Sequence, residues 1–286
     1  MFTKKTLTYF FAVVLAAWTI LPIYWVVQMS LSYNIELLIS PTHLYPHTPT
    51  ISNYTRIWGG SAPGLDGVPL KPVGQGPLVT RGLANSLFVA VATTLLTLIL
   101  GMPAAYALGR LKFRFKGPLL FSIILSKSYP TISILLPFYA LYRYTNLLAT
   151  YTGLIIIYLT ATLPISIWIM AGFFSSLPRN LEAAARVDGN TRFQAFWRVV
   201  CRVGAPGLAA TGAISFMAAW NEFVFAWLLT TGSDVMTVPP ALTSMFFQIS
   251  WPNEMAAAVV MTMIPPMVLA FLFQRQIRNV NLVDYL

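Results

Sequence analysis

The sequence predicts an all-α membrane protein with six transmembrane helices. Of its 286 residues, 57% are hydrophobic and only 9% are charged, whereas soluble domains carry about 25% charged residues. Six apolar segments each approach the roughly 20 residues that a helix needs to cross the hydrocarbon of a bilayer. None of them alternates apolar and polar residues as a strand of a membrane barrel does. Together these observations indicate a helical bundle.

The first apolar segment, residues 7–31, follows Lys4 and Lys5. A signal peptide has an apolar region of about 7–15 residues and then a small-residue cleavage site. This segment is longer, and no convincing cleavage site follows it. We therefore expect a retained transmembrane helix with a kink at Pro22. Residues 32–84 are rich in Pro, Gly, Thr and Asn, and should form an outer loop with some structure of its own.

The other five spans are expected at residues 85–108, 118–141, 153–174, 203–230 and 255–273. Prolines within them remove helix hydrogen bonds, which is tolerated where neighbouring helices or a water-filled path satisfy the freed carbonyls. Examples are Pro130, Pro137, Pro164, Pro265 and Pro266. In the fifth span Gly207, Ala210 and Ala213 are small enough to let another helix approach closely.

The positions of the basic residues predict the orientation. A cytoplasmic N-terminus places 13 of the 18 lysines and arginines inside: Lys4, Lys5, four within 110–116, five within 179–202, Arg275 and Arg278. The outer loops then hold Arg56, Lys71, Arg81 and Arg143, and Lys127 alone falls within a span. Cytoplasmic loops of membrane proteins carry such an excess of Lys and Arg. Both termini are therefore expected in the cytoplasm, and the net charge of +10 reflects topology rather than nucleic-acid binding.

One polar stretch, residues 180–202, interrupts the apolar sequence and should form two short helices joined by a turn. Asn180 can cap the first helix, and Glu182 lies in its first turn, where the helix dipole favours a negative charge. Gly189 follows at the position where helices commonly end in the left-handed conformation. In the second helix one apolar stripe contains Phe193, Phe196, Trp197 and Val200. A compact unit of this kind between two apolar segments indicates a cytoplasmic docking element.

The spacing within this stretch resembles the EAA loop of binding-protein-dependent ABC importer permeases. The matching residues are Glu182-Ala183-Ala184, then Asp188-Gly189, then the aliphatic Val199 ten positions after the glycine. The family pattern usually ends in Leu-Pro, where this chain has Cys201-Arg202. In that family the loop is a coupling helix that fits into a cleft on a cytoplasmic ATPase. The resemblance therefore implies that Glu182, Ala183, Ala184, Asp188 and Gly189 couple this chain to an ATPase.

Three further segments are similar to carbohydrate importer permeases, most closely to the MalG-like half of the maltose type. They are Asn85-Ser86-Leu87, Ala104-Ala105-Tyr106-Ala107-Leu108 and Trp220-Asn221-Glu222-Phe223. The resemblance implies the type I importer permease bundle. Its organisation would be a first helix and extracytoplasmic loop (1–84), a permease domain with the coupling loop 180–202 (85–275), and a cytoplasmic tail (276–286).

The same resemblance implies a transport subunit, not an enzyme, that moves a sugar or oligosaccharide by alternating access across the cytoplasmic membrane of a prokaryote. Its partners would be a second, MalF-like permease, two copies of an ABC ATPase, an extracytoplasmic binding protein and membrane lipid. The chain contains no GxxxxGK[ST] loop, so ATP and Mg would be bound by the ATPase subunits. No cofactor or metal is expected on this chain, which has a single cysteine.

Polar residues within the spans are candidates for the solute path or its gate. An ionisable group at depth costs at least ~2.5–3.5 kcal/mol, so it usually faces a cavity or a partner. Lys127, Asn221 and Glu222 fit this description, and a structural pair is the alternative interpretation. A sugar would be held by hydrogen bonds and aromatic faces, for which Trp220 and Tyr129 are candidates, with simple packing as their alternative.

Two other functions remain open from the sequence. The first is the same architecture with another solute, such as glycerol phosphate or a polyamine; an anionic solute would call for more intramembrane Arg or Lys than Lys127 alone. The second is a secondary transporter that works without an ATPase. That class shows internal repeats or matching broken helices, which are not evident here, and it would leave the EAA-like loop unexplained.

Overall fold

The computed structural model describes residues 4–38, 44–178, 180–247 and 251–278. The chain divides into two compact units. Unit 1 consists of residues 1–83 and 240–264, and unit 2 of residues 84–239 and 265–286. From position 279 onward, the C-terminal tail predicted at 276–286 lies outside the described residues, as does Arg179.

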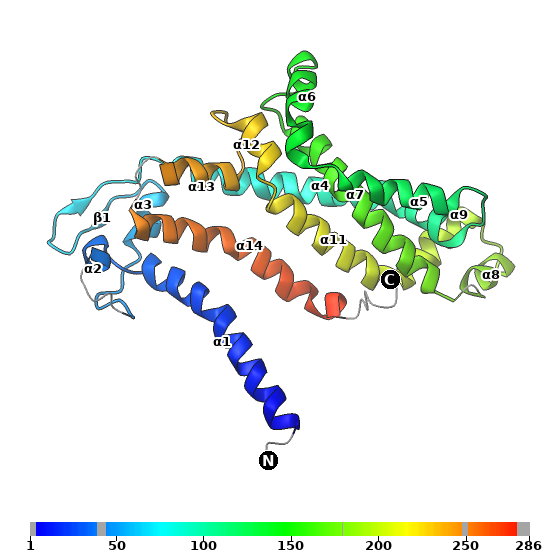
Figure 1. Ribbon diagram of the computed structural model, residues 1–286, viewed down its shortest axis with the longest axis horizontal. Coiled ribbons are helices and arrows are strands. Elements are labelled where there is room, and N and C mark those ends of the chain that lie inside the picture. Colours follow the sequence, from blue (N-terminus) through cyan, green and yellow to red (C-terminus); the bar gives the residue numbers. More distant parts are fainter. Residues whose placement is uncertain (1–3, 39–43, 179, 248–250, 279–286) are drawn as a thin grey trace. The chain divides into compact units, whose positions relative to one another are not determined.

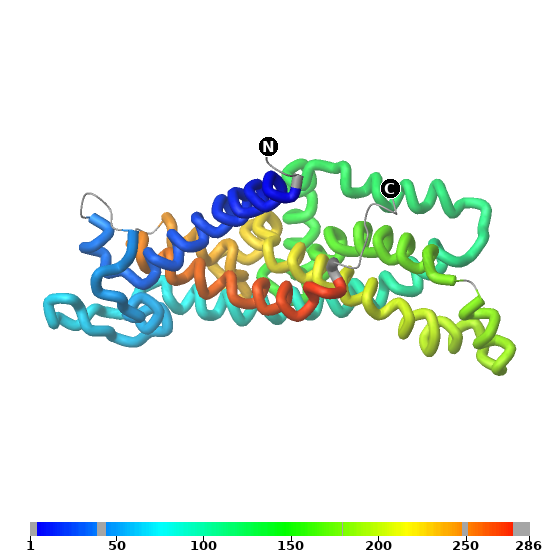
Figure 2. The backbone as a smooth tube through the Cα atoms, turned by 90° about the horizontal axis from the view of Figure 1, so that it is seen from below, coloured from blue at the N-terminus to red at the C-terminus, as the bar shows by residue number. Residues whose placement is uncertain are grey.

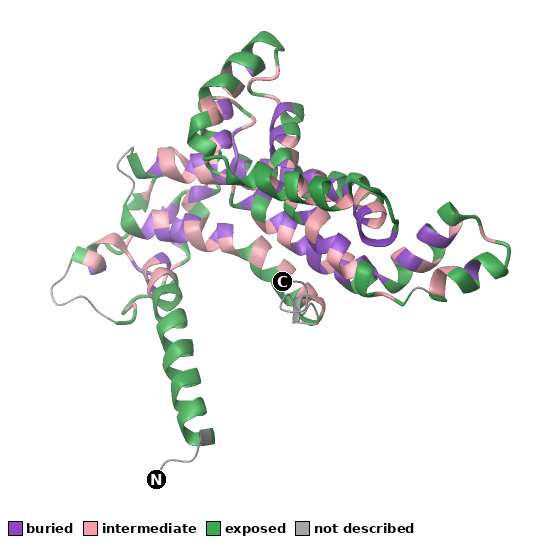
Figure 3. Cartoon of the chain, turned by 45° about the vertical axis from the view of Figure 1, so that its right-hand side comes forward, coloured by how far each residue is buried: buried purple, intermediate pink, exposed green. Residues whose placement is uncertain are grey.

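Four continuous helices are long and apolar enough to cross a membrane, as the sequence predicts for the first, second, fourth and sixth spans. They are α1 (Lys4–Ser30), α4 (Gly76–Arg110), α7 (Tyr151–Ser176) and α14 (Pro252–Arg278) (Figure 1). Residues 5–24 of α1 are exposed throughout (Figure 3). Because these side chains are almost all apolar, this surface is suited to lipid or to another membrane helix.

The third span is not the single helix expected at 118–141. Helix α5 (Lys116–Leu125) continues into the 3₁₀ turn η1 (Ser126–Ser128), and α6 (Thr131–Tyr144) then runs at 90° to it (Figure 2). Pro130 accounts for the break, because it has no backbone N–H and forces the preceding residue out of helical geometry. Tyr129 accordingly has an extended backbone, with ψ of 130°.

The fifth span is also broken, although one helix was expected at 203–230. Helix α11 (Ala205–Trp220) ends before Asn221, and α12 (Val224–Thr230) begins after three intervening residues. At its other end α11 is bent by 76° from the helical run Arg192–Val203. Pro206 stands in the first turn of α11 and cannot donate the hydrogen bond that would continue the preceding helix.

A hydrophobic core of unit 2 lies where α4 and α7 meet the second helix of the coupling loop. It contains Ala105, Leu108, Met170, Ala171, Phe174, Phe196 and Val200. Helix α7 also packs on α11, where the hydroxyls of Ser166 and Ser215 lie 2.8 Å apart. A Cβ at Gly207 of α11 would lie 2.5 Å from the ring of Phe173 in α7. This close approach confirms the expected role of the small residues in the fifth span.

Unit 1 contains the outer loop, which has structure of its own as expected. Its short elements are α2 (Asn34–Leu38), α3 (Ser52–Ile57) and the strands β1 (Ala62–Pro63) and β2 (Pro69–Leu70). The strands pair antiparallel, with Ala62 opposite Leu70. Unit 1 also includes the beginning of α4, the end of α13 (Val238–Phe247) and the beginning of α14. Helix α13 lies between the expected fifth and sixth spans, 203–230 and 255–273, where no helix was predicted.

Candidate functional site: the coupling loop and the breaks in the spans

The first helix of the coupling loop is α8 (Asn180–Val187). Gly189 follows it with φ of +83°, as predicted. The N–H of Asn190 donates to the carbonyl of Ala185 at 3.0 Å, and the N–H of Gly189 donates to that of Arg186 at 3.1 Å. These are the two hydrogen bonds of a Schellman motif, which satisfies the last carbonyls of a helix. A Cβ at Gly189 would meet no atom within 4 Å, so the turn needs glycine only for its backbone geometry.

Replacing Gly189 is therefore expected to test the turn without steric interference. Gly189→Val should cost on the order of 1–2 kcal/mol locally, because a β-branched residue strongly disfavours the left-handed conformation. It should reduce co-purification of the ATPase while the chain stays in the membrane. Gly189→Asn is the matched control, since asparagine tolerates this conformation. Equal ATPase recovery with the valine and asparagine variants would contradict the importance of the turn.

The second helix of the loop combines α-helical and π-helical turns. A capping box of Thr191 and Gln194 opens α9 (Arg192–Ala195), and the chain continues through the π-helical turn η2 (Phe196–Val200) into α10 (Cys201–Val203). The predicted four-residue apolar stripe is wrong in part. Phe196 and Val200 are buried, whereas Phe193 is 70% exposed and Trp197 is also exposed. The wider π turn changes the angular spacing of side chains, so an α-helical period does not hold through it.

Phe196 joins the coupling loop to the membrane helices. Its ring centroid lies 4.7 Å from that of Tyr106 in α4 and 6.3 Å from that of Phe174 in α7. The rings of Tyr106 and Phe174 are themselves 6.4 Å apart. Burial of these rings away from water stabilises the fold, and each well-oriented aromatic pair adds a further ~0.5–1.5 kcal/mol of stability.

A buried arginine makes a second link. The Nε of Arg110, the last residue of α4, lies 2.7 Å from Oε1 of Glu182 in α8. Its Nη2 donates to the carbonyl of Pro178 at 3.0 Å, and its Nη1 donates to the carbonyls of Leu177 and Phe174. The side chain of Arg110 is only 3% exposed. We refer to this set of contacts, together with the hydrogen bond from Tyr106 to Glu182, as the Arg110 clasp.

The Arg110 clasp holds three helix ends together. Carbonyls at the C-terminus of a helix have no partner within the helix, and the guanidinium supplies donors to those at the end of α7. The hydroxyl of Tyr106 donates to Oε2 of Glu182 at 3.2 Å, so both carboxylate oxygens are engaged within the chain. From the sequence, Glu182 was expected to couple the chain to an ATPase, and Arg110 was expected to be one of the cations of a cytoplasmic loop. The sequence signals that could have suggested this pair are an acidic residue in α8 and an arginine at the end of α4.

The remaining residues of α8 border two hollows. One, of about 570 Å³, lies beside the Arg110 clasp and is bordered by the exposed cations Lys112, Arg186 and Arg192. The other, of about 390 Å³, is lined by Leu181, Ala184, Asp188 and Val199 among others. Ala183 and Ala184 are exposed. Basic groups beside a small-residue helix face form a surface on which another protein can dock.

The candidate path residues lie at the breaks in the spans. Lys127 is in η1, where its Nζ donates to the carbonyl of Ala161 at 2.9 Å, and Tyr129 is exposed at the bend before α6. The amide of Asn221 donates to the carbonyl of Met217 at 2.9 Å. Trp220 is buried and stacks on Phe216 with the ring centroids 5.7 Å apart.

Glu222 caps a helix rather than pairing with Lys127. Its two carboxylate oxygens accept from the N–H groups of Phe225 and Ala226, each at 3.0 Å. These are among the first N–H groups of α12, which have no partner inside that helix. A carboxylate at this position is stabilised by the hydrogen bonds and by the helix dipole.

Glu222→Gln is expected to keep much of this cap, because the amide oxygen still accepts one hydrogen bond. Glu222→Leu should remove it and destabilise α12 by about 0.5–2 kcal/mol. We therefore expect graded loss of uptake, small for glutamine and larger for leucine, at constant membrane insertion. The measurement is solute uptake into proteoliposomes at matched protein content. Complete loss with Glu222→Gln would instead indicate that the charge itself acts in transport.

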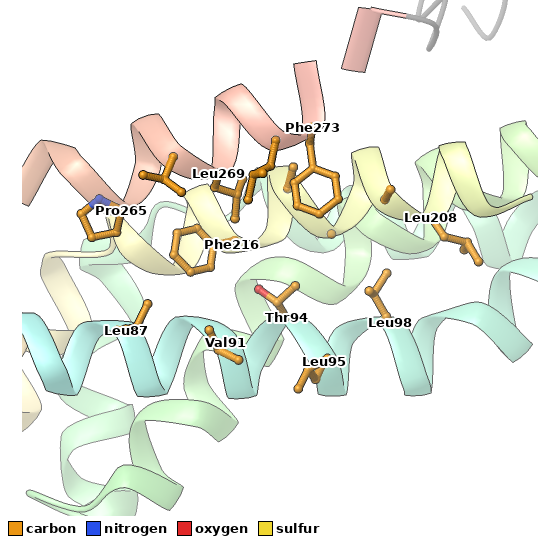
Figure 4. Close-up of a pocket in the computed structure, with 15 residues that line it drawn as sticks. Leu87, Val91, Thr94, Leu95, Leu98, Leu208, Phe216, Pro265, Leu269 and Phe273 are labelled. Carbon is orange, nitrogen blue, oxygen red and sulfur yellow. The ribbon is translucent and has the colours of Figure 1, made fainter. Parts of the chain in front are cut away.

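A long groove in unit 2 runs between α4, α11 and α14 (Figure 4). Its volume is about 540 Å³, and its lining is apolar except for Thr94. Leu87, Val91, Phe216 and Leu269 point toward it. A sugar needs hydrogen-bonding groups, so this groove is unsuited to hold one and suits an apolar helix or acyl chain.

Residues 98–279 match the family described as "Binding-protein-dependent transport system inner membrane component". The chain belongs to this family. The match includes the whole coupling loop, the Arg110 clasp and both broken spans. The chain is therefore an inner-membrane transport component, specifically an ABC importer permease, as its EAA-like spacing predicts.

Similar proteins align with this permease over nearly its whole length. The sulfoquinovosyl glycerol permease SmoH of Agrobacterium fabrum is 32% identical over 96% of this chain and 92% of its own. The trehalose permease SugB of Mycobacterium tuberculosis is 33% identical over 91% and 89%. The trehalose/maltose permease MalG of Thermococcus litoralis is 33% identical over 96% and 94%.

Solved structures confirm the fold class. A chain of a bacterial ABC transporter for the acidic polysaccharide alginate superposes with a TM-score of 0.76, at 21% identity, over 96% of this permease and 98% of that chain. The MetNI methionine transporter matches with a TM-score of 0.57, at 16% identity, over 71% and 96%. At these identities the likeness concerns the fold alone, which is the type I importer permease bundle.

Proposed function

We propose that this permease imports a sugar or oligosaccharide. The observation that carries the proposal is the full-length similarity to SmoH, SugB and MalG, whose names all refer to sugars or glycosides. The sparse intramembrane charge supports the same choice over glycerol phosphate or polyamine, because a neutral solute needs no buried counter-ion. Uptake of radiolabelled trehalose, maltose and glycerol phosphate by the reconstituted transporter tests it. Uptake of glycerol phosphate alone would contradict it.

The transporter would contain a MalF-like permease, two ABC ATPases that bind ATP and Mg, and an extracytoplasmic binding protein. The family description supports dependence on a binding protein. The permease itself would bind no cofactor. Both of its termini would lie in the cytoplasm with the coupling loop, as the distribution of lysines and arginines indicates. The proposed organisation is a first helix and extracytoplasmic loop (1–84), a permease domain (85–275) and a cytoplasmic tail (276–286).

Coupling would pass through α8. Its face of Ala183, Ala184 and Asp188 would meet the ATPase, with Gly189 directing the chain back toward the membrane. Glu182 would act from inside the permease, because both of its oxygens are engaged by Arg110 and Tyr106. A displacement of α8 would then reach α4 and α7 through the Arg110 clasp and through Phe196. This arrangement converts motion at the docking surface into motion of two membrane helices.

The breaks in the third and fifth spans would serve as hinges of the gate. They bring Lys127 and Tyr129 to one bend, and Trp220, Asn221 and Glu222 to the other. A few residues at element ends commonly absorb the backbone change when domains close. The apolar groove of Figure 4 is unsuited to a sugar, so solute contacts would come from these breaks and from the partner permease.

Unit 1, which contains the outer loop, is expected to contact the binding protein. Its exposed aromatic residues include Trp58 and Phe246, which are 68% and 64% exposed. In a Cys201→Ser background, Trp58→Cys and Phe246→Cys should form cross-links to the binding protein during turnover. Tyr9→Cys, on the exposed face of α1, is a control that should not. Free labelling of Trp58→Cys and Phe246→Cys without any cross-link would contradict this prediction.

A further inference from the structure

A basic hollow lies in unit 2 between the coupling loop and the α4–α5 loop, residues 111–115. Its volume is about 570 Å³, within the range of small-molecule sites. The lining comes from the end of α4, from the α4–α5 loop, from α8 and from α9. The Arg110 clasp forms one wall. The lining residues outside the clasp give the hollow a chemistry of its own.

Three cations line the basic hollow without a partner. Lys112, Arg186 and Arg192 are exposed, and none of them makes an ion pair or a side-chain hydrogen bond with another residue that the structure describes. Glu182 supplies the single carboxylate of the lining, and both of its oxygens are engaged within the Arg110 clasp. Three positive charges are thus left uncompensated. A cleft lined by charges of one sign concentrates ions of the opposite sign, so this hollow favours an anion.

The α4–α5 loop places one side of the basic hollow at the membrane surface. The loop joins the end of α4 directly to α5, the first half of the bent third span. Side chains so close to the ends of two spans lie at the level of the lipid headgroups. Phe113 and Phe115 are exposed, and Phe113 lines the hollow. They alternate in sequence with the cations Lys112, Arg114 and Lys116, a mixture that suits the boundary between headgroups and acyl chains.

The basic hollow and the proposed ATPase face occupy opposite sides of α8. Glu182 and Arg186 line the basic hollow, whereas Ala184 and Asp188 line the other hollow, of about 390 Å³. Successive residues of an α-helix are about 100° apart around its axis, so positions 184 and 188 lie about 200° from positions 182 and 186. Ala183 lies between the two faces. An ATPase seated on the Ala184 side would therefore leave the basic hollow to another ligand.

We propose that the basic hollow binds the headgroup of an anionic phospholipid. Arg186 and Arg192 donate to its phosphate oxygens, because the guanidinium fork matches the geometry of a phosphate, and Lys112 supplies a third charge. Phe113 packs on the first carbons of an acyl chain. Clusters of Lys and Arg just cytoplasmic of a membrane helix are typical of sites for anionic lipids. The inference rests on the proposed cytoplasmic position of the coupling loop and not on the identity of the solute.

The test measures lipid binding by the full-length permease. The purified protein in a neutral detergent is titrated with phosphatidylglycerol or with zwitterionic phosphatidylcholine, and bound lipid is counted by native mass spectrometry. We expect one phosphatidylglycerol to bind more tightly than any phosphatidylcholine, and to bind more weakly as ammonium acetate is raised, because salt screens the charges. Arg186→Gln and Arg192→Gln should each weaken this binding roughly fivefold, the factor expected for one cation near an anionic headgroup.

Two double variants with the same change in net charge make the test specific. Arg186→Gln with Arg192→Gln should weaken phosphatidylglycerol binding roughly 25-fold, the product of the two single effects. Arg202→Gln with Arg275→Gln is the matched control, since these arginines do not line the hollow, and it should bind as the unaltered chain does. All four side chains are exposed, so neither variant should unfold the protein. Equal weakening in both would contradict a site at this hollow.

Three further results would overturn the inference. Equal affinity for phosphatidylglycerol and phosphatidylcholine would show that the charge is not recognised. Displacement of the lipid by millimolar inorganic phosphate would show a site for a free anion. Unchanged lipid binding by Arg186→Gln with Arg192→Gln, together with lost co-purification of the ATPase, would assign these cations to the ATPase interface. Because binding is measured in detergent without solute, failure of the lipid site stays distinct from failure of the proposed orientation or of sugar import.

Discussion

Arg110→Ala is expected to reduce ATP-driven uptake strongly while the permease remains in the membrane. The substitution leaves the carboxylate of Glu182 without its cation and frees the carbonyls of Phe174, Leu177 and Pro178. Removal of one member of a buried ion pair typically costs ~3–5 kcal/mol. Because the lost contacts join α4, α7 and α8, the damage should concentrate where the coupling loop meets the bundle. The measurement is uptake together with ATP hydrolysis in proteoliposomes.

Two other variants make this prediction specific. Arg110→Lys keeps the charge but loses the planar fork that reaches several acceptors at once, so it should restore little uptake. Arg114→Ala is the matched control, since Arg114 is an exposed cation over the Phe115 ring and lies outside the clasp. Normal uptake by Arg110→Ala, or equal loss with Arg114→Ala, would contradict the proposed role of the clasp.

Phe196→Ala should produce the second large effect. The side chain is buried and contacts the rings of Tyr106 and Phe174, so truncation should cost ~3–5 kcal/mol. We expect a lower thermal unfolding temperature of the purified permease and loss of uptake. Phe196→Leu, which fills more of the space, should be intermediate.

The control for this position lies three residues earlier. Phe193 is in the same helical run but is 70% exposed, so Phe193→Ala should leave the unfolding temperature of the isolated permease unchanged. Its effect, if any, should appear only in the assembled transporter, where a partner can cover the ring. Equal destabilisation by Phe193→Ala and Phe196→Ala would contradict the π-helical arrangement of η2.

Local signals in the sequence predicted much of this fold. Four spans follow from apolar runs of sufficient length, and the turn at Gly189 follows from the requirement for a left-handed residue after α8. The spacing of Thr191 and Gln194 also indicates the capping box at the start of α9. These features depend on residues close together in the chain, and periodicity and capping rules can therefore predict them.

The remaining features depend on contacts or competition that a local pattern does not show. Pro130 was expected to weaken the third span but produces a 90° bend, and the hydrogen bonds by which the candidate path residue Glu222 caps α12 were not predicted. Arg110 and Glu182 are 72 positions apart, so neither could be assigned to the other from one sequence. The buried partner of Glu182 changes its proposed role from external contact to internal link.

A double-mutant cycle tests the central claim most directly. ATP hydrolysis coupled to uptake is measured in reconstituted transporters that carry Arg110→Ala, Glu182→Ala, or both. If the two side chains act through one clasp, the second substitution should add little to the first, with an interaction energy of about 0.5–3 kcal/mol. Membrane insertion and recovery of the partner permease should remain constant throughout. Independent effects that simply add would show that Arg110 and Glu182 do not work as one link, and would contradict this account of coupling.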